Sequence, residues 1–363
     1  MTEGYASTAP VIKVAGTPNA ALARDVTFLR VEESSDGMKA LEMHLTGEGP
    51  RPGEAVEGEL WLDGRVLDFG AALDISVGPT ESAYVIFRGA ISAIESSVRA
   101  SGVPTPIVFA EDRLMQLRLT RRMHTYSQSS DADIVREIAR QHGLRADVGA
   151  DGPTYDVVQQ WNQSDLAFLR ERARLLQAEL WIDDDTLFFA TRGQRTATTM
   201  TLTVGSELLD VQCRADLAHQ RTSVRVSGYD AQERDAIDEE AGADTIQAEI
   251  DGGRTGPAVL QQAFGERVSY RVRSGPLVDG EARDWARAEM LRRARAFVTA
   301  SGTTNGTAAM VVGSTLTLAG VGSPFIGGGY HVTRVCHTYD LTDGFRTYFE
   351  AERATVNASG AEA

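Results

Sequence analysis

The sequence has almost no cysteine: Cys213 and Cys336 are the only two among 363 residues. Without an extracellular context, two cysteines favour reduced thiols over a structural disulfide. The sequence also has no apolar run of about 20 residues, the length that spans a bilayer. No charged segment followed by an apolar segment comes after Met1, as it would in a secretory signal. These absences predict a protein that stays in the cytoplasm and does not insert into a membrane.

Positive charge is scarce as well. The chain has 36 Lys and Arg against 51 Asp and Glu, a formal net charge of −15. Nucleic acids and anionic membranes require a cationic footprint on their partner, so we expect neither as a ligand. Basic residues do cluster between Glu111 and Arg122, but a solvated face or local salt bridging explains them better than a phosphate-binding patch. Hydrophobic residues make up 42% of the sequence, which is ordinary for a soluble protein of about two or three domains.

Recognisable catalytic patterns are missing too. There is no HExxH, no G-x-S-x-G and no Walker loop. The segment Gly320–Phe325 lacks the third glycine of a dinucleotide-binding loop and precedes a strand pattern. His331 and His337 would lie roughly 20 Å apart along a strand, which is too far for shared zinc ligation. Asp183–Asp185 lacks the spaced ligands of a calcium loop. We predict no metal, no cofactor and no catalysis, although a carboxylate pair for sugar hydrolysis has no fixed spacing by which to find it.

The first part of the chain predicts short strands. Residues 1–19 are small and polar and predict a loose arm. Asp36-Gly37 is a hairpin-turn signal, and residues 60–67 resemble a second hairpin. We therefore predict a β domain over residues 20–110. One strand alternates apolar and polar residues, which places three of them on one face: Leu41, Met43 and Leu45.

The next part predicts two helices and a hairpin. Ser130 and Asp133 form a capping-box pattern at the start of one helix. Ser164-Asp165 can begin a second helix, because serine caps the first turn and aspartate favours the positive end of the helix dipole. Residues 179–190 then predict strand, acidic turn and strand. Together these elements predict a small α/β module over residues 111–195.

Strands resume in the last part, where we predict a second β domain over residues 196–352 and a C-terminal tail over residues 353–363. Residues 231–256 are acidic and rich in glycine, which predicts an exposed connection. A long helix is predicted over residues 279–300. Small and apolar residues lie along one side of this helix: Ala282, Ala286, Met290, Ala294 and Phe297.

One longer segment is more specific. From Tyr155 to Phe189 the chain reads YDVVQQWNQSDLAFLRERARLLQAELWIDDDTLFF. This segment resembles the phage late control D family and the N-terminal hub part of VgrG-type spike proteins. Flanking motifs follow in the same order, so the resemblance extends over residues 20–352. Twelve residues carry it: Phe87, Gly89, Ile91, Gln160, Ser164, Asp165, Phe168, Leu169, Tyr330, Val332, Thr333 and His337. Each also has an explanation in packing, capping or turn formation, as expected where a family signature records structure.

The resemblance implies a mainly β, α+β fold with two related, tube-like β-barrel domains joined by the small α/β module. It implies a homotrimeric, pseudo-sixfold ring that acts as the baseplate hub of a phage tail or contractile injection system. Such a hub adapts a sixfold inner tube to a threefold spike and contacts other baseplate subunits. VgrG-type chains continue into a needle, whereas few residues follow Glu350 here, so we expect the spike to be a separate protein.

Two other functions stay open: a tail-associated cell-wall hydrolase, and a binding module or effector carried by the particle. The sequence does not separate a phage tail from an extracellular injection particle or a type VI apparatus. We expect assembly into one of these particles from the cytoplasm.

Overall fold

The computed structural model describes residues 9–50, 57–78, 83–100, 102–195, 197–231, 233–272 and 277–357. The protein is mainly β, with 49% strand and 22% helix. The chain folds into two compact units. Unit 1 comprises residues 1–115, 303–311 and 334–349, and unit 2 comprises residues 116–302, 312–333 and 350–363. The division of the chain into two β domains and a module, as predicted from the sequence, stays a prediction.

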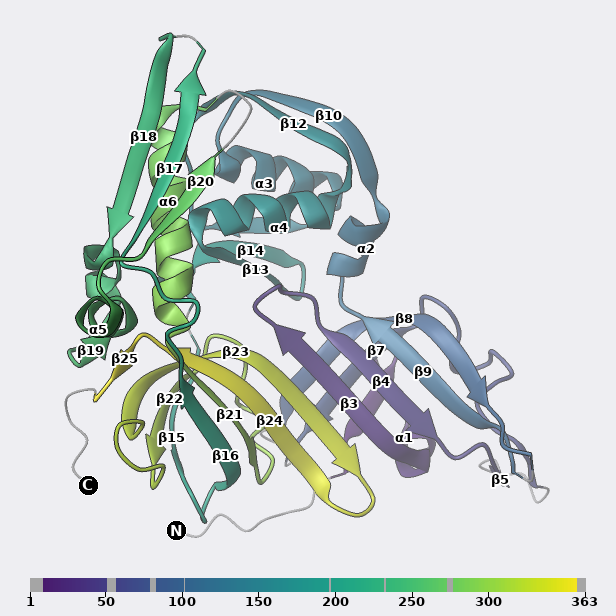
Figure 1. Cartoon of the computed structure of the whole chain (residues 1–363). Coiled ribbons are helices and arrows are strands. Elements are labelled where there is room, and N and C mark those ends of the chain that lie inside the picture. The colour runs from purple at the N-terminus through teal and green to yellow at the C-terminus, as the bar shows by residue number, and fades with distance from the viewer. Residues whose placement is uncertain are drawn as a thin grey trace. The chain divides into compact units, whose positions relative to one another are not determined.

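Unit 1 is built on one sheet (Figure 1). Its strand order is β24–β23–β3–β4–β9–β8–β7–β1–β2, with residues 344–349 of β24 and 334–340 of β23 belonging to this unit. The strands are β1 (Val11–Val14), β2 (Thr17–Pro18), β3 (Val26–Ser34), β4 (Ala40–Leu45), β7 (Ala72–Val77), β8 (Tyr84–Ser97), β9 (Thr105–Glu111), β23 (Gly327–Asp340) and β24 (Gly344–Arg353). Helix α1 (Ala20–Asp25) and a two-stranded ribbon of β5 (Glu48–Pro50) and β6 (Glu57–Glu59) complete the unit.

The core of unit 1 follows the predicted alternation. The apolar face of β4 is buried, and the Asp36-Gly37 turn joins β3 to β4 as predicted. Strand β8 carries β-bulges opposite both neighbours, which increase the twist of the sheet. No strand in the described part of unit 1 pairs across the two ends of this order, so the sheet does not form the closed barrel that the resemblance implies.

Two local predictions in unit 1 are wrong. Residues 60–67 form a loop, not a hairpin. Trp61 has a left-handed backbone (φ 70°), and its indole Nε1 donates to Asp25 Oδ2 at 3.2 Å, which holds the chain out of a strand. Residues 11–18 of the predicted arm are strands β1 and β2, because Ile12 pairs with Ile75 of β7 and is buried. Residues 1–8 of that arm lie outside the described part of the chain.

The first part of unit 2 combines helices with short strands. A ribbon of two antiparallel strands, β10 and β12, lies beside helices α3 and α4, and a three-stranded sheet has the order β11–β14–β13. The elements are α2 (Leu114–Leu119), β10 (Arg121–Ser129), α3 (Asp131–Gln141), β11 (Arg145–Val148), β12 (Tyr155–Ser164), α4 (Asp165–Leu176), β13 (Ala178–Asp183) and β14 (Thr186–Thr191). Ser130 and Asp133 form the expected capping box, and Ser164 caps α4.

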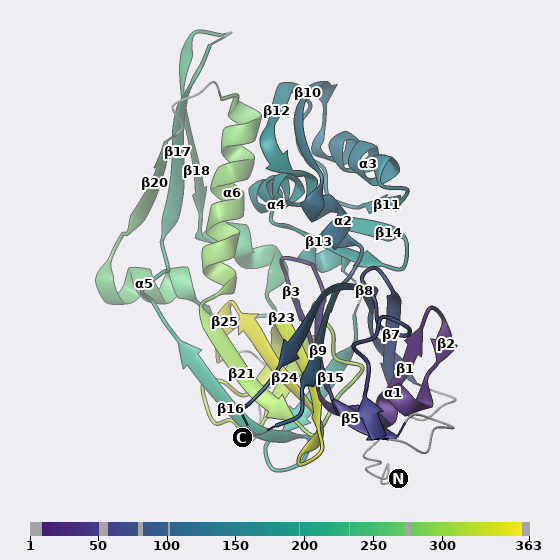
Figure 2. The same cartoon turned by 90° about the vertical axis from the view of Figure 1, so that its right-hand side faces the viewer.

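A second sheet of unit 2 packs on a long helix, α6 (Asp279–Arg295). Its order is β18 (Asp235–Gly242), β17 (Ser223–Asp230) and β20 (Val268–Val272), and Figures 1 and 2 both show these strands beside α6. The predicted apolar side of α6 is confirmed in part: Ala282, Ala286 and Met290 share one buried cluster with the sheet, whereas Ala294 is in a second cluster and Phe297 follows the helix. The helix ends at Arg295, short of the predicted residue 300, since strand β21 (Val298–Thr304) begins there.

The predicted exposed connection is also wrong in part. Strand β18 and a 3-10 helix (Ala243–Glu249) occupy residues 235–249, and buried Ile237, Ala241 and Ile246 anchor them. The sequence pattern did not reveal this strand, because the strand has few apolar residues among many acidic ones. The remaining elements of unit 2 are η1 (Arg192–Gln194), β15 (Thr199–Thr203), β16 (Leu208–Ala215), β19 (Arg254–Thr255), α5 (Gly256–Phe264), β22 (Thr315–Ala319) and β25 (Thr355–Val356). Within the described residues, no helix is both long enough and apolar enough to cross a bilayer.

Candidate functional site

The first motif residues lie in strand β8 of unit 1. Phe87 and Ile91 belong to the buried core of the unit, and Gly89 lies between them in the strand. A side chain at Gly89 would place its Cβ 2.2 Å from the carbonyl oxygen of Glu111 in β9 and 2.5 Å from the Phe87 ring. Gly89 of the motif F-x-G-x-I therefore allows strands β8 and β9 to pack closely.

The substitution Gly89→Ala tests this packing. We expect a loss of about 1 to 3 kcal/mol in the free energy of unfolding, because the backbone of β9 has to move to admit the methyl group. Urea denaturation measures the loss. Gly193→Ala is the control: nothing lies within 4 Å of its Cβ position, and we expect a change within about 0.5 kcal/mol. Equal effects of the two substitutions would contradict this assignment.

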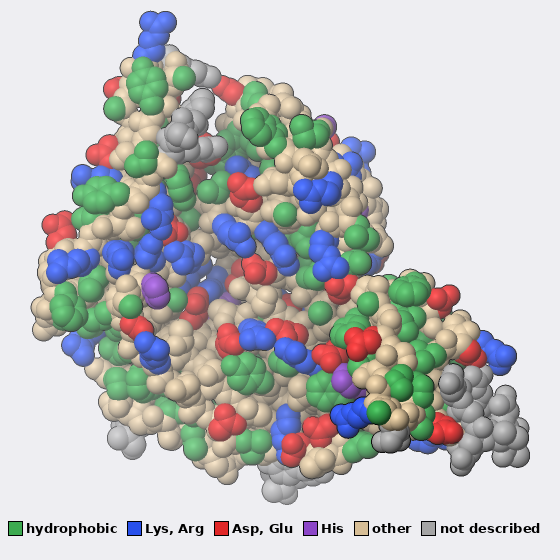
Figure 3. Space-filling model, turned by 45° about the vertical axis from the view of Figure 1, so that its right-hand side comes forward, with side chains coloured by type: hydrophobic (Ala, Val, Ile, Leu, Met, Phe, Trp, Pro, Cys, Tyr) green, Lys and Arg blue, Asp and Glu red, His purple; other side chains and the backbone are tan. Residues whose placement is uncertain are grey.

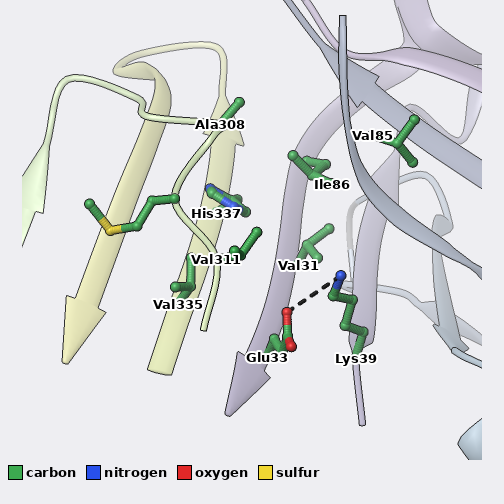
Figure 4. Close-up of a pocket in the computed structure, with 10 residues that line it drawn as sticks. Val31, Glu33, Lys39, Val85, Ile86, Ala308, Val311, Val335 and His337 are labelled. Atoms are coloured by element: carbon green, nitrogen blue, oxygen red, sulfur yellow. Dashed lines mark ion pairs between the residues drawn. The ribbon is translucent and has the colours of Figure 1, made fainter. Parts of the chain in front are cut away.

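His337 of β23 lines a small pocket in unit 1, together with Val31, Ile86 and the ion pair of Lys39 with Glu33 (Figure 4). Its Nδ1 lies 3.0 Å from Thr347 Oγ1. Lys39 Nζ lies 3.4 Å from Glu33 Oε2 across the pocket. His337 is thus bonded to Thr347 and Lys39 to Glu33, and the other side chains that line the pocket are apolar.

Burial, and secondarily the charge of Lys39, lowers the pKa of His337 to about 4. Because its folded pKa lies below its unfolded value, His337 stabilises the fold above its unfolded pKa, and this contribution is lost as the pH falls. The advantage of the wild type over His337→Gln should therefore shrink by about 2 kcal/mol between pH 7 and pH 5. The nearby Asp112, whose pKa burial raises to about 7, is present in both proteins and cancels in this comparison.

Urea denaturation of both proteins at each pH measures this difference. His219→Gln, at an exposed position, is the control and should show no such change with pH. A constant advantage of the wild type over His337→Gln from pH 7 to pH 5 would show that His337 can be protonated within the fold.

The second group of motif residues lies where β12 meets α4 in unit 2. Asp165 is fully buried and accepts hydrogen bonds from Arg122 Nε at 2.9 Å and from Gln160 Nε2 at 2.9 Å. His142 Nε2 lies 2.7 Å from the same carboxylate. Ser164 Oγ accepts from the backbone N–H of Ala167 at 3.2 Å, which caps the helix. The Gln, Ser and Asp of the motif thus tie α4 to β10, β12 and the end of α3.

The remaining motif residues of α4, Phe168 and Leu169, are core, with the Phe168 ring stacked on Tyr126 at 5.7 Å. A second buried network lies close by in the same module. Asp131 of α3 accepts from Arg172 Nε at 2.5 Å and from the Tyr155 hydroxyl at 3.0 Å. The sequence analysis missed this network, although Asp131 is the acid directly after a helix cap.

The third group lies on the first half of β23 in unit 2. Tyr330 is fully buried and donates its hydroxyl hydrogen bond to Phe325 O at 2.6 Å. Val332 is fully buried, and Thr333 donates to Glu350 O at 3.3 Å. The guanidinium of Arg353 lies 4.3 Å above the Tyr330 ring.

Arg353 itself was missed by the sequence analysis. It is 4% exposed and donates to four backbone carbonyls: Thr355 O at 2.8 Å, Pro324 O at 3.1 Å, Gly328 O at 3.3 Å and Ile326 O at 3.4 Å. The predicted tail therefore begins later than residue 353, because Thr355 and Val356 also pair with β19. Residues 358–363 lie outside the described part of the chain.

The twelve motif residues do not converge on one reactive centre. They fall into separate packing groups, and each group is buried among residues of its own unit. His331, one of the residues weighed for a metal site, contacts Glu179 at 3.3 Å. Over the residues that the structure covers, no group of three or more His, Cys, Asp or Glu side chains could hold a metal ion. The functional meaning of the motif residues stays a prediction.

Solved structures share this fold over nearly its whole length. A 43 kDa tail protein of prophage MuSo2 from Shewanella oneidensis is 12% identical, with a TM-score of 0.68, and the match covers 96% of this chain and 98% of that one. A tail protein from Neisseria meningitidis MC58 is 10% identical, with a TM-score of 0.65, covering 95% and 96% of the two chains. At this identity the likeness shows the fold, which is that of phage tail proteins.

A third similar structure is a component of the Escherichia coli type VI secretion system, described as similar to the bacteriophage T4 tail proteins gp27 and gp5. It is 12% identical with a TM-score of 0.59, and the match covers 97% of this chain and 79% of that one. No curated protein matches the chain by sequence. A family model, described as the Alg8 N-terminal domain, matches residues 59–340. Because this match covers more than half of the sequence, the chain belongs to the Alg8 N-terminal domain family.

Proposed function

We propose that this protein is a structural hub of a baseplate in a phage tail or contractile injection system. The observation that carries the proposal is the match of nearly the whole chain to nearly the whole of a prophage tail protein, with a TM-score of 0.68. The likeness to a type VI secretion component adds a second kind of injection machine with the same fold. The collinear motifs of the late control D family and of VgrG-type hubs agree with both.

The hub works by geometry. Three copies, each with two tube-like β domains, present six similar surfaces to a sixfold inner tube and three to a spike. The partners are thus two further copies, the inner tube protein, the spike protein and other baseplate subunits.

We propose that the protein is not an enzyme. In support, each motif residue is buried in a core, caps a helix or binds neighbouring backbone, and the His337 pocket contains only an internal ion pair and apolar side chains. A polar network that is fully bonded within the fold stabilises a structure and leaves no group to act on a substrate. Packing alone can therefore account for the residues that carry the family resemblance.

The proposal is tested by a pull-down of a tagged copy from its native host, with the bound proteins identified by mass spectrometry. We expect inner tube, spike and baseplate subunits to be recovered. Light scattering of the purified protein should give about three times the 39.2 kDa of one chain. Recovery of the chain alone, or clearing of peptidoglycan in a zymogram, would overturn the hub in favour of a hydrolase.

A further inference from the structure

An excess of arginine surrounds one carboxylate on helix α6. Glu289 Oε1 accepts from Arg271 of β20 at 2.5 Å, from Arg292 at 2.8 Å and from Arg293 at 3.0 Å. Three guanidinium groups thus share one acid, which is 13% exposed. Burial opposes the ionisation of Glu289, yet its hydrogen bonds with Arg292 and Arg271 lower its pKa to about 2. The single negative charge of Glu289 is shared by three guanidinium groups, so it does not neutralise all of their positive charge.

Two more arginines extend the cluster. Arg221 acts electrostatically on Arg293, and its guanidinium donates only to backbone carbonyls of residues 218 and 220. Arg267 is exposed, and its backbone exchanges hydrogen bonds with Thr222, the residue next to Arg221. We name these five residues the arginine cluster: Arg221, Arg267, Arg271, Arg292 and Arg293. Glu352 also acts on Arg292, but its carboxylate is already bound by Arg192.

The buried member of the cluster is incompletely bonded. Arg293 is 10% exposed; Nη1 donates to His219 O at 3.0 Å and Nη2 to Glu289, while Nε is buried without a hydrogen-bond partner. Burial lowers the pKa of Arg293, and the charges of Arg292, Arg271 and Arg221 lower it further against the opposing effect of Glu289. The positive charge of Arg293 is therefore only partly offset by Glu289.

The surface around the cluster is accessible. Side chains of Arg292 and Arg271 are 54% and 35% exposed. Figure 3 shows many Lys and Arg side chains among the exposed side chains of the face turned to the viewer. Every member of the cluster is arginine in a chain whose only lysines are Lys13 and Lys39. Arginine differs from lysine in presenting a planar fork that binds both oxygens of a carboxylate.

We propose that the arginine cluster is a docking site for an acidic segment of a partner protein, whose carboxylates bind the guanidinium groups left in excess. A short acidic segment fits better than a nucleic acid, because the net charge of −15 repels a long polyanion while the local excess of arginine attracts a few carboxylates. The site does not depend on the hub assignment, since it is defined by residues of unit 2 alone.

The test is fluorescence anisotropy of labelled hexaglutamate with the full chain at low and at physiological salt. We expect binding that weakens with salt. Arg292→Glu and Arg267→Glu should each weaken it by at least about tenfold, because each reverses one charge of the cluster. Arg267→Glu keeps the experiment decisive if Arg292→Glu disturbs the helix, since the Arg267 side chain bonds only to a neighbouring carbonyl.

Arg283→Glu is the matched control. It lies on the same helix, is 57% exposed and pairs with Glu239 on β18, away from the cluster. Binding within about twofold of the wild type is expected for it. Failure of hexaglutamate to bind, or an equal loss with Arg283→Glu, would overturn the site. Tighter binding of a short single-stranded oligonucleotide, or complete displacement of hexaglutamate by equimolar inorganic phosphate, would overturn the acidic protein segment as its ligand.

Discussion

Replacing Asp165 by alanine should lower the free energy of unfolding by about 3 to 5 kcal/mol. The carboxylate is fully buried and binds Arg122, His142 and Gln160, so its removal leaves the positive charge of Arg122 without its partner. Breaking one side of a buried pair costs this much because the remaining charge stays desolvated. Arg122 is 30% exposed, which lets water reach part of it and favours the lower end of the range.

Urea denaturation followed by circular dichroism measures the effect of Asp165→Ala. Glu171→Ala is the control on the same helix: it is exposed and accepts only from Gln163, so we expect a change within about 0.5 kcal/mol. Adding Arg122→Met to Asp165→Ala should recover part of the loss, because the uncompensated charge is then gone. A double variant that is less stable than the single one would show that Arg122 stabilises the module independently of Asp165.

Replacing Arg353 by methionine should cost at least about 3 kcal/mol. Methionine keeps much of the side-chain volume but cannot donate, so the carbonyl groups of Pro324, Ile326, Gly328 and Thr355 lose their shared donor inside the protein. A hydrogen bond from a charged group contributes roughly 1.5 to 3 kcal/mol, and buried acceptors left without a donor add to the loss. The contact with the Tyr330 ring is lost as well.

Arg353→Lys separates charge from geometry. Lysine retains the charge but has one ammonium in place of a planar fork, so it should recover less than half of the loss. Arg283→Met, at an exposed ion pair, should change stability by less than about 1 kcal/mol. If Arg353→Lys matches the wild type, the positive charge alone, and not the fork over Tyr330, holds this end of β23.

The starts of α3 and α4 and the β13–β14 hairpin could be predicted from the sequence because their signals are local. Ser130 and Ser164 cap their helices within three residues, and the hairpin at Asp183–Asp185 turns within its own segment. Strand β18 could not be predicted in this way. Its partner β17 is next to it in the chain, but its packing on α6 comes from residues about 40 positions later, and four of its eight residues are acidic. Local composition carries no information about such partners.

The residues of the candidate site also divide into those that a local motif reveals and those that it does not. Gln160, Ser164 and Asp165 were found because they form a contiguous motif, whereas Arg122, His142 and Arg353 were not. These three act on the motif residues from 23 or more positions away in the sequence, and Arg353 also follows the end of the predicted domain. A single sequence can reveal a motif, but the residues that bind it from other elements become visible only in three dimensions.

The interleaving of the two units bears on how the protein is made. The chain passes between them at residues 115–116, 302–303, 311–312, 333–334 and 349–350. Strand β3 pairs with residues 334–340 of β23, which are synthesised long after it. Because a domain folds as a unit during translation only once its residues have left the ribosome, the sheet of unit 1 stays incomplete until residues 334–349 have emerged. Until then, the nascent chain presents the edge of β3 that later pairs with β23.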